Sequence, residues 1–191
     1  MRFEDGSVMR LYRQTVEDFG LYTGKELDEN ELAALKKAAG EMSAKMRAVR
    51  IVSASSVSKR DLEQRLIHKG EDPKQAKQAV EWMSELNLLD DAKTAEQVVH
   101  RCISKGYGLA RAKQALYEKR IPKEYWDEAL ADYPDQSHKI LDFLRSRLGS
   151  DYDEKDLRRA TDALMRRGHS YREIRKALDE LELELDLEEE F

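Results

Sequence analysis

The sequence predicts an all-α protein made of tandem three-helix repeats in an elongated array, after a short irregular N-terminal lead-in. Two observations predict this fold class. The chain has only three prolines and nine glycines, 38% of its residues are charged, and long alternating runs of Val, Ile and Thr are scarce. It also matches itself at a spacing of about 49 residues, which is typical of small units that gain stability by packing on their neighbours.

The repeat is carried by three segments that align without a gap: residues 62–80, 112–130 and 160–178. A leucine holds the same position in each segment: Leu66, Leu116 and Leu164. The turn position that follows holds Gly70, Arg120 and Gly168. The predicted organisation is a lead-in with one short helix at residues 1–41, repeat one at 42–90, repeat two at 91–134, and repeat three with an acidic tail at 135–191.

Capping signals place the helices of the first two segments. In the lead-in, Asp28 is a suitable N-cap for a short helix that ends at Gly40. Repeat one begins near Met42. Ser58 can cap its second helix, and Asp72, which precedes a proline, can start its third, because proline at the first helical position gives up no hydrogen bond.

Repeat two has the most complete set of start and stop signals. Asp90 and Asp91 are candidate caps of its first helix, where negative charge favours the positive end of the helix dipole. Gly106 and Gly108 belong to the sequence KGYG, which predicts that this helix stops and the next one starts at once. KGYG is too short for a phosphate-binding loop, so a structural role is the simpler interpretation.

Repeat three is predicted to have helices over residues 136–148 and 153–167, separated by a Gly-Ser break at 149–150. Ser170 and Glu173 form a capping box that starts the last helix. That helix continues into the acidic tail, where alternate leucines fit neither a helix stripe nor a strand and where we expect fraying.

Charge is segregated along the chain. The formal net charge is −5, yet residues 179–191 contain eight acidic residues and no basic one. Residues 91–120 hold seven basic and three acidic residues, and residues 155–176 hold eight and three. These basic faces predict a partner with regular negative charge, above all nucleic acid or a nucleoprotein, and an ordinary solvated helix face is the alternative. The candidate binding residues are Arg101, Lys105, Arg111, Lys113, Lys119, Arg158, Arg159, Arg166, Arg167, Arg172 and Arg175.

Aromatic residues lie among these basic ones: Tyr107, Tyr117, Tyr125, Trp126 and Tyr133. Stacking on nucleic-acid bases is one interpretation of this mixture. Trp126, however, takes the position that Ala76 and Ile174 hold in the other copies, which favours a place in the core.

The sequence favours a protein without catalytic or metal chemistry. The four histidines, at positions 68, 100, 138 and 169, are scattered singly and form no metal-ligand spacing, so we expect no metal and no cofactor. No nucleophile motif is present, which predicts that the chain is not an enzyme.

Cys102, on an apolar-periodic helix, is expected to be a buried thiol. No apolar run suits a membrane span or a signal peptide, which predicts a cytoplasmic protein.

Several short elements, taken in order, resemble the RecX family. They are the LLDD of residues 88–91, Ala95 with Glu96, the KGYG of 105–108, the Leu116 helix with its KRI turn, and the S-x-x-DL and L-x-x-KG elements at 58–62 and 66–70. The resemblance covers residues 42–178. The chain departs from the family pattern at Thr94, where an aromatic is usual, at Arg120, where glycine is usual, and in the sequence SASSVSKRDL before the first helix pair.

The resemblance implies a fold of helix-turn-helix-like repeats bent into a crescent. It also implies a partner, the RecA recombinase filament, and a function: a regulator of homologous recombination and DNA repair, mainly a negative one. Such a protein lies in the groove of the filament on single-stranded DNA and limits ATP hydrolysis, strand exchange and filament growth. We expect a monomer that contacts DNA within the filament, and that binds DNA directly only weakly.

A protein that binds duplex DNA directly, as a helix-turn-helix transcription factor does, is the alternative. Such a protein usually has one helix with base-reading side chains in its first turn, together with a dimer seam. The chain offers no heptad pattern in residues 36–46, and no single recognition helix stands out.

Overall fold

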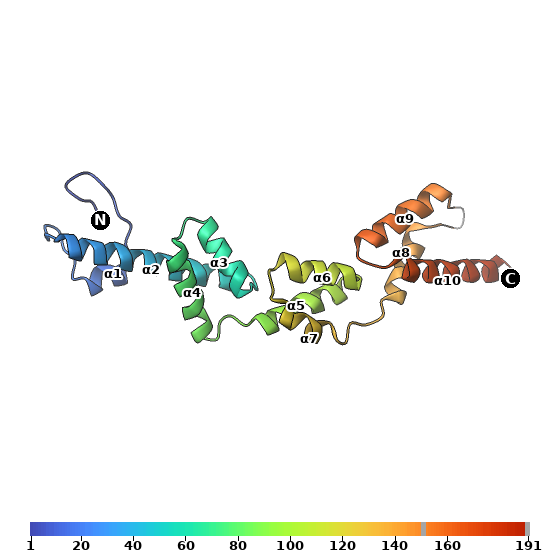
Figure 1. Ribbon diagram of the computed structural model, residues 1–191. Coiled ribbons are helices and arrows are strands. Elements are labelled where there is room, and N and C mark those ends of the chain that lie inside the picture. The colour runs from blue at the N-terminus through green and yellow to red at the C-terminus, as the bar shows by residue number, and fades with distance from the viewer. Residues whose placement is uncertain (150–151, 190–191) are drawn as a thin grey trace. The chain divides into compact units, whose positions relative to one another are not determined.

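The computed structural model describes residues 1–149 and 152–189, with backbone alone for residues 184–189 (Figure 1). Over those residues the regular secondary structure is helical, and the only β pairing is an isolated bridge between Arg2 and Val8. The predicted all-α class is therefore confirmed. The chain divides into two units, residues 1–90 and Asp91 onward. The elongated, curved array and the four-segment division stay predictions.

The first unit contains four helices: α1 (Arg13–Asp18), α2 (Glu29–Ala54), α3 (Lys59–His68) and α4 (Pro73–Glu85). The second half of α2 packs against α3 and α4 around one hydrophobic core, formed by alanines of α2, leucines of α3, and both small and larger residues of α4. The fully buried members of this core include Ala44, Ala48, Leu62, Leu66 and Ala76. Close packing of helices explains why alanines hold the α2 positions.

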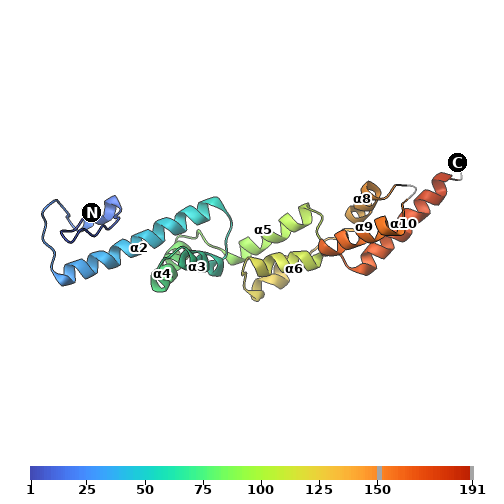
Figure 2. The same ribbon diagram turned by 90° about the horizontal axis from the view of Figure 1, so that it is seen from above.

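The predicted stop at Gly40 is wrong. α2 is one uninterrupted helix through this residue, as Figure 2 shows, so the boundary between the predicted lead-in and repeat one falls inside a helix. At Gly40 the helix packs on α4, and a Cβ atom there would require the end of the flexible Gln75 side chain to shift. Gln75 in turn donates a hydrogen bond to the carbonyl of Lys37 at 3.4 Å.

The predicted caps of the first unit are confirmed. Asp28 forms a capping box with Glu31, the Ser58 hydroxyl accepts a hydrogen bond from the amide of Asp61 at 3.1 Å, and Asp72 accepts from the first turn of α4. These side chains satisfy amides that the helix itself leaves without a partner, which is why the sequence marks the helix starts so well.

The second unit contains two further groups of helices. Its first group consists of α5 (Asp91–Ser104), α6 (Leu109–Glu118), the 3₁₀ turn η1 (Lys123–Tyr125) and α7 (Trp126–Leu130). The second group consists of α8 (Ser137–Arg147), α9 (Glu154–Arg166) and α10 (Tyr171–Glu189). Each group has its own hydrophobic core, and the largest fully buried side chains are Leu116 in one and Ile140, Leu144, Leu164 and Ile174 in the other.

Repeat two departs from its neighbours in its last helix. α7 is a short helix after η1, whereas the equivalent α4 and α10 are much longer. Trp126 packs against the core of this group, and its indole N–H donates to the carbonyl of Ile121 at 3.0 Å. Trp126 therefore packs on the core, as predicted, and is partly buried there.

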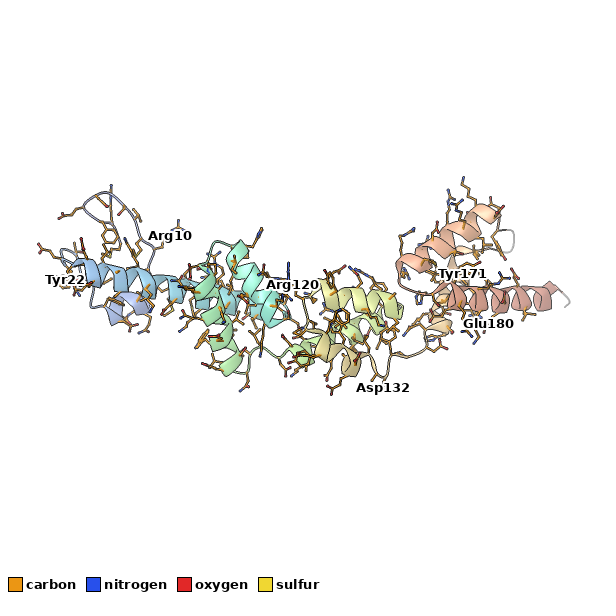
Figure 3. The ribbon with its side chains drawn as sticks, viewed as in Figure 1. Arg10, Tyr22, Arg120, Asp132, Tyr171 and Glu180 are labelled. Carbon is orange, nitrogen blue, oxygen red and sulfur yellow. The ribbon has the colours of Figure 1, made fainter. Side chains whose placement is uncertain are left out.

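The three repeats share one turn geometry. Leu66, Leu116 and Leu164 are at most 1% exposed. The turn residues Gly70, Arg120 and Gly168 all have a left-handed φ, at 89°, 53° and 88°. In each copy the following amide closes the turn on the leucine carbonyl, at 3.1, 3.1 and 3.2 Å, as in a Schellman motif. Arg120, labelled in Figure 3, therefore holds a glycine-type conformation despite its Cβ atom.

The helices of repeat three follow the prediction closely. Asp153 caps α9 through the amide of Asp156 at 2.8 Å, and Ser170 and Glu173 form the predicted capping box of α10. Ser150, in the predicted break, lies outside the described residues, as do Glu190 and Phe191 at the end of the tail. Among the described residues, no helix combines the length and the apolar character that a membrane span requires.

Candidate functional site

The predicted basic residues of repeat two lie on α5 and α6 or directly after them, with Lys105 following α5 and Lys119 following α6. Arg101, Lys105 and Lys113 are exposed, and Arg111 and Lys119 are half-buried. Arg111 forms an ion pair with Glu118 at 2.9 Å, and this contact raises the pKa of Arg111 and lowers that of Glu118. Because its charge is already compensated, Arg111 is less available to a partner than the exposed cations around it.

The predicted basic residues of repeat three are all exposed. Arg158, Arg159 and Arg166 lie on α9, with Arg167 at its end, and Arg172 and Arg175 lie on the first turns of α10. The structure does not gather them into one patch. Arg159 and Arg166 line a groove against α8, whereas Arg172 and Arg175 line a cleft against repeat two.

The cleft between repeats two and three has a volume of about 800 Å³. Besides Arg172 and Arg175 it is lined by Lys176 and by three carboxylates, those of Asp135, Glu173 and Asp179. Two of the carboxylates are held by local hydrogen bonds, since Asp135 accepts from Ser137 at 2.7 Å and Glu173 accepts from Ser170 at 2.7 Å. The hydrogen bonds from Ser137 lower the pKa of Asp135. Positive and negative groups are balanced here, so the cleft does not select an anion by charge alone.

The groove between α8 and α9 has a volume of about 400 Å³ and a different chemistry. Phe143, Ala160 and Ala163 supply its apolar lining. Its charged lining residues are Arg147, Asp156, Arg159 and Arg166. The guanidinium carbons of Arg147 and Arg167 lie 5.6 and 4.5 Å from the centre of the Phe143 ring, which is within cation–π range.

Sequence reasoning missed Phe143 and Arg147 as members of this groove. Their separation of one helical turn on α8 was a signal, because side chains at i and i+4 meet on one face. Nothing local, however, connects them to α9. The groove depends on how α8 and α9 pack, and that is a tertiary property.

Repeats two and three are joined by main-chain contacts around two glycines. The amide of Gly108 donates to the carbonyl of Arg167 at 2.9 Å, and the amide of Ala110 donates to the carbonyl of Gly168 at 3.3 Å. A Cβ atom on Gly108 would collide with the main chain at Gly168, and one on Gly168 would collide with the main chain of Arg111. The KGYG sequence is thus a helix stop, as predicted, and also half of a joint between repeats.

A buried histidine completes this joint. His169 is 4% exposed, and its Nε2 lies 3.0 Å from the carbonyl oxygen of Gly106. This contact places a proton on Nε2 of the neutral ring, while Nδ1 has no hydrogen-bond partner among the described residues. Burial lowers the pKa of His169, because desolvation disfavours the charged imidazolium.

The aromatic residues of repeat two divide by exposure. Tyr125, Trp126 and Tyr133 pack against the core, and the Tyr133 hydroxyl donates to the carbonyl of Tyr107 at 2.7 Å. Burial raises the pKa of Tyr133 to about 12. Tyr117 alone of the five candidates is largely exposed, at 68%. Packing within the repeat therefore explains three of the five stacking candidates, Tyr125, Trp126 and Tyr133, while the ring of Tyr107 is half-buried.

The other singled-out residues, Asp90, Asp91 and Cys102, lie at a helix start or in the interior. Asp90 directly precedes α5, and Asp91 is its first residue and is 6% exposed, at the end of the helix where the prediction put both. Cys102 is buried, and burial raises the pKa of its thiol. Among the residues that the structure describes, no three His, Cys, Asp or Glu side chains are grouped in a way that could hold a metal ion.

Comparison with known proteins identifies what the chain is similar to. The family model for the second three-helix domain of RecX matches residues 90–130. The regulatory protein RecX of Xanthomonas campestris pv. campestris is 31% identical over 134 residues, which cover 69% of this chain and 83% of that protein. The regulatory protein RecX of Vibrio parahaemolyticus is 27% identical over 146 residues, covering 75% of this chain and 94% of the relative.

Two crystal structures have a similar fold. One, a regulatory protein RecX, superimposes with a TM-score of 0.66 at 21% identity and covers 93% of this chain and 92% of its own. The other, RecX from Lactobacillus salivarius, has a TM-score of 0.62 at 20% identity and covers 76% of this chain and 99% of its own. At these identities the likeness concerns the fold.

Proposed function

Because this chain belongs to the RecX family, we propose that it is a non-enzymatic regulator of the RecA recombinase that binds the RecA–DNA filament in its groove. It limits ATP hydrolysis, strand exchange and filament extension, and so restrains recombination and DNA repair. The filament combines protein with phosphate-bearing single-stranded DNA, so its groove offers the regular negative charge that the basic repeats require.

The exposed cations of repeats two and three carry this proposal. Arg101, Lys105 and Lys113 on one repeat, and Arg158 and Arg172 on the next, are exposed, whereas the core side chains of each repeat pack within it. Cations with this placement contribute little to folding, because exposed ion pairs stabilise by at most about 1 kcal/mol. They are free to steer association with a polyanion, which makes binding fast and sensitive to salt.

Several weak contacts suffice for the regulation that we propose. Each repeat supplies only a few cations, but repeats that are linked in one chain bind the same filament at a high effective concentration, so their contributions multiply. A chain that contacts successive filament subunits in this way opposes the subunit motions that accompany ATP hydrolysis. It also obstructs the groove in which a second DNA strand must be accommodated during strand exchange.

A binding titration tests the proposal. The labelled protein is titrated with RecA-coated single-stranded DNA and with naked duplex DNA at moderate ionic strength, and ATP hydrolysis by the filament is followed in parallel. Tighter binding to the coated DNA, with slower hydrolysis, is the expected result. Tighter binding to the naked duplex, with hydrolysis unaffected, would instead favour a helix-turn-helix protein that acts on duplex DNA.

A further inference from the structure

The groove between α8 and α9 combines properties that an ordinary solvated helix face lacks. Its apolar lining is the aromatic ring of Phe143 and the two alanines Ala160 and Ala163, and its charged part holds three arginines. The single carboxylate in the lining, Asp156, lies 3.4 Å from Arg159 and compensates only one of these charges. Arg167 adds a further guanidinium on the ring. The groove is therefore strongly positive around a flat apolar surface.

This chemistry selects a ligand that is both planar and anionic. A free phosphate would use the arginines but leave the ring without a partner, and aspartate and glutamate side chains alone offer no aromatic group to place on it. An unpaired nucleotide has both parts, because its base stacks on aromatic rings and guanidinium planes while its phosphates pair with arginines. The volume of about 400 Å³ lies within the range of sites for one small ligand.

We propose that this groove binds an unpaired nucleotide of single-stranded DNA, with the base beside Phe143 and the phosphates on Arg147, Arg159 and Arg166. Base-paired DNA cannot use the site in this way, because its bases are stacked within the duplex and present only phosphates to an arginine rim. The proposal deepens the proposed function and rests on it for its setting, since it adds a direct contact between repeat three and the DNA of the filament.

Two of the arginines already contact the ring. The guanidinium groups of Arg147 and Arg167 lie within cation–π range of Phe143, so fewer side-chain rotamers have to be fixed when a base binds. Guanidinium groups are weakly hydrated and stack on flat π systems, so a base can lie on an arginine plane or replace it on the ring.

Fluorescence anisotropy with the full chain and a labelled oligothymidylate tests the site at low salt. Phe143→Leu removes the flat ring but keeps apolar bulk, and it should weaken binding at least about fivefold, the lower end of the effect of losing one stacked base. Phe143→Trp, which restores a ring, should bind as tightly as the native chain. Arg147→Ala should weaken binding, while Arg145→Ala should not, because Arg145 lies on the same helix but does not line the groove.

Two further probes separate the sources of affinity. An abasic oligonucleotide of the same length should bind the native chain at least about fivefold more weakly than oligothymidylate, because it offers no base to stack. A duplex of the same length should be insensitive to Phe143→Leu. Equal binding of abasic and thymidine strands, or unchanged affinity of a folded Phe143→Leu chain, would overturn the proposal.

The same variants keep this proposal distinct from the proposed function. If Phe143→Leu loses the RecA filament but keeps naked single-stranded DNA, the groove contacts the recombinase itself, and the nucleotide site is overturned while filament regulation stands. If the native chain binds the oligonucleotide through the groove but does not bind the filament, the site is supported and the proposed function fails.

Discussion

The Nε2 atom of His169 lies 3.0 Å from the carbonyl oxygen of Gly106, and both residues are buried. This contact joins the turn after α9 to the turn after α5. It is supported by the main-chain hydrogen bonds from Gly108 and Ala110 to the end of α9. Backbone groups around glycines and one buried histidine thus connect repeats two and three.

The joint should loosen in acid. Burial lowers the pKa of His169 below its ordinary 6.5, and the opposing effects of the Gly106 hydrogen bond and of Glu173 do not offset it. The unfolded chain therefore takes up a proton near pH 6.5, whereas the folded chain does so only at lower pH. It follows that the free energy of unfolding of the second unit falls as the pH drops below 6.5.

Urea unfolding at about pH 7.5 and about pH 5.5 measures this effect. His169→Gln keeps a hydrogen-bond donor but cannot titrate, so it should reduce the loss of stability in acid. His100→Gln, at an exposed position on α5, is the matched control and should leave the loss unchanged. An equal loss in all three chains would show that His169 does not set the acid response.

The close approach of Gly108 and Gly168 predicts that alanine is not tolerated at Gly168. Gly70 and Gly168 have nearly the same φ, 89° and 88°, but a Cβ on Gly70 would meet open space, whereas one on Gly168 would meet the main chain of Arg111. Gly70→Ala should lower the free energy of unfolding by about 1–2 kcal/mol, the cost of a left-handed non-glycine residue. Gly168→Ala should cost clearly more, because main-chain atoms must move.

The two tryptophans allow each unit to be followed by itself. Trp82 reports on the first unit and Trp126 on the second, once the other tryptophan is replaced by phenylalanine. Equal losses for Gly70→Ala and Gly168→Ala, each measured in its own unit, would mean that the joint adjusts without cost and that the glycine contact is not needed.

Arg120 offers the converse test, a position where glycine should stabilise. Its φ of 53° carries the cost of a Cβ atom in the left-handed region, in a turn where the other repeats have glycine. Arg120→Ala removes the long side chain and keeps this cost, whereas Arg120→Gly removes both. We expect the glycine variant to be more stable than the alanine variant by about 1 kcal/mol in urea unfolding. An alanine variant as stable as the glycine variant would show that the turn is unstrained.

Local signals in the sequence predicted the start of most helices and the three equivalent turns. Asp28, Ser58, Asp72 and Ser170 cap helices where expected, because a cap depends on residues within one turn of it. The wrong prediction of a helix stop at Gly40 also rested on a local signal. A glycine reads locally as a helix stop, but the packing of α2 on α4 outweighs that preference.

The sequence predicted which basic residues are candidates for binding, but not how their side chains are arranged. Clusters of basic residues in the sequence identified Arg159 and Arg166, yet not that they share a groove with Phe143 and Arg147 of α8. The ion pair that compensates Arg111 was also missed, because its partner Glu118 is seven residues away, two turns along α6. The groove depends on the packing of α8 against α9, which periodicity and composition do not encode.

Reversing basic charges should weaken filament binding when the residues lie in the second unit, but not when they lie in the first. Arg172→Glu and Arg175→Glu, at exposed positions of α10, should together weaken filament binding and make the remaining binding less sensitive to salt, because fewer counterions are released. Lys74→Glu with Lys77→Glu makes the same change of charge at exposed positions of α4 and is the control. Equal weakening in both chains, with helicity unchanged, would mean that net charge rather than the basic faces determines affinity.

Hydrogen exchange with and without the RecA filament tests the central claim most directly, since it reports on each helix separately. If the basic repeats bind the filament, amides of α6, α9 and the first turns of α10 exchange more slowly when it is added, while those of α1 are unaffected. Slower exchange confined to α1 and α2, with α9 and α10 unchanged, would contradict the assignment of the binding surface to repeats two and three.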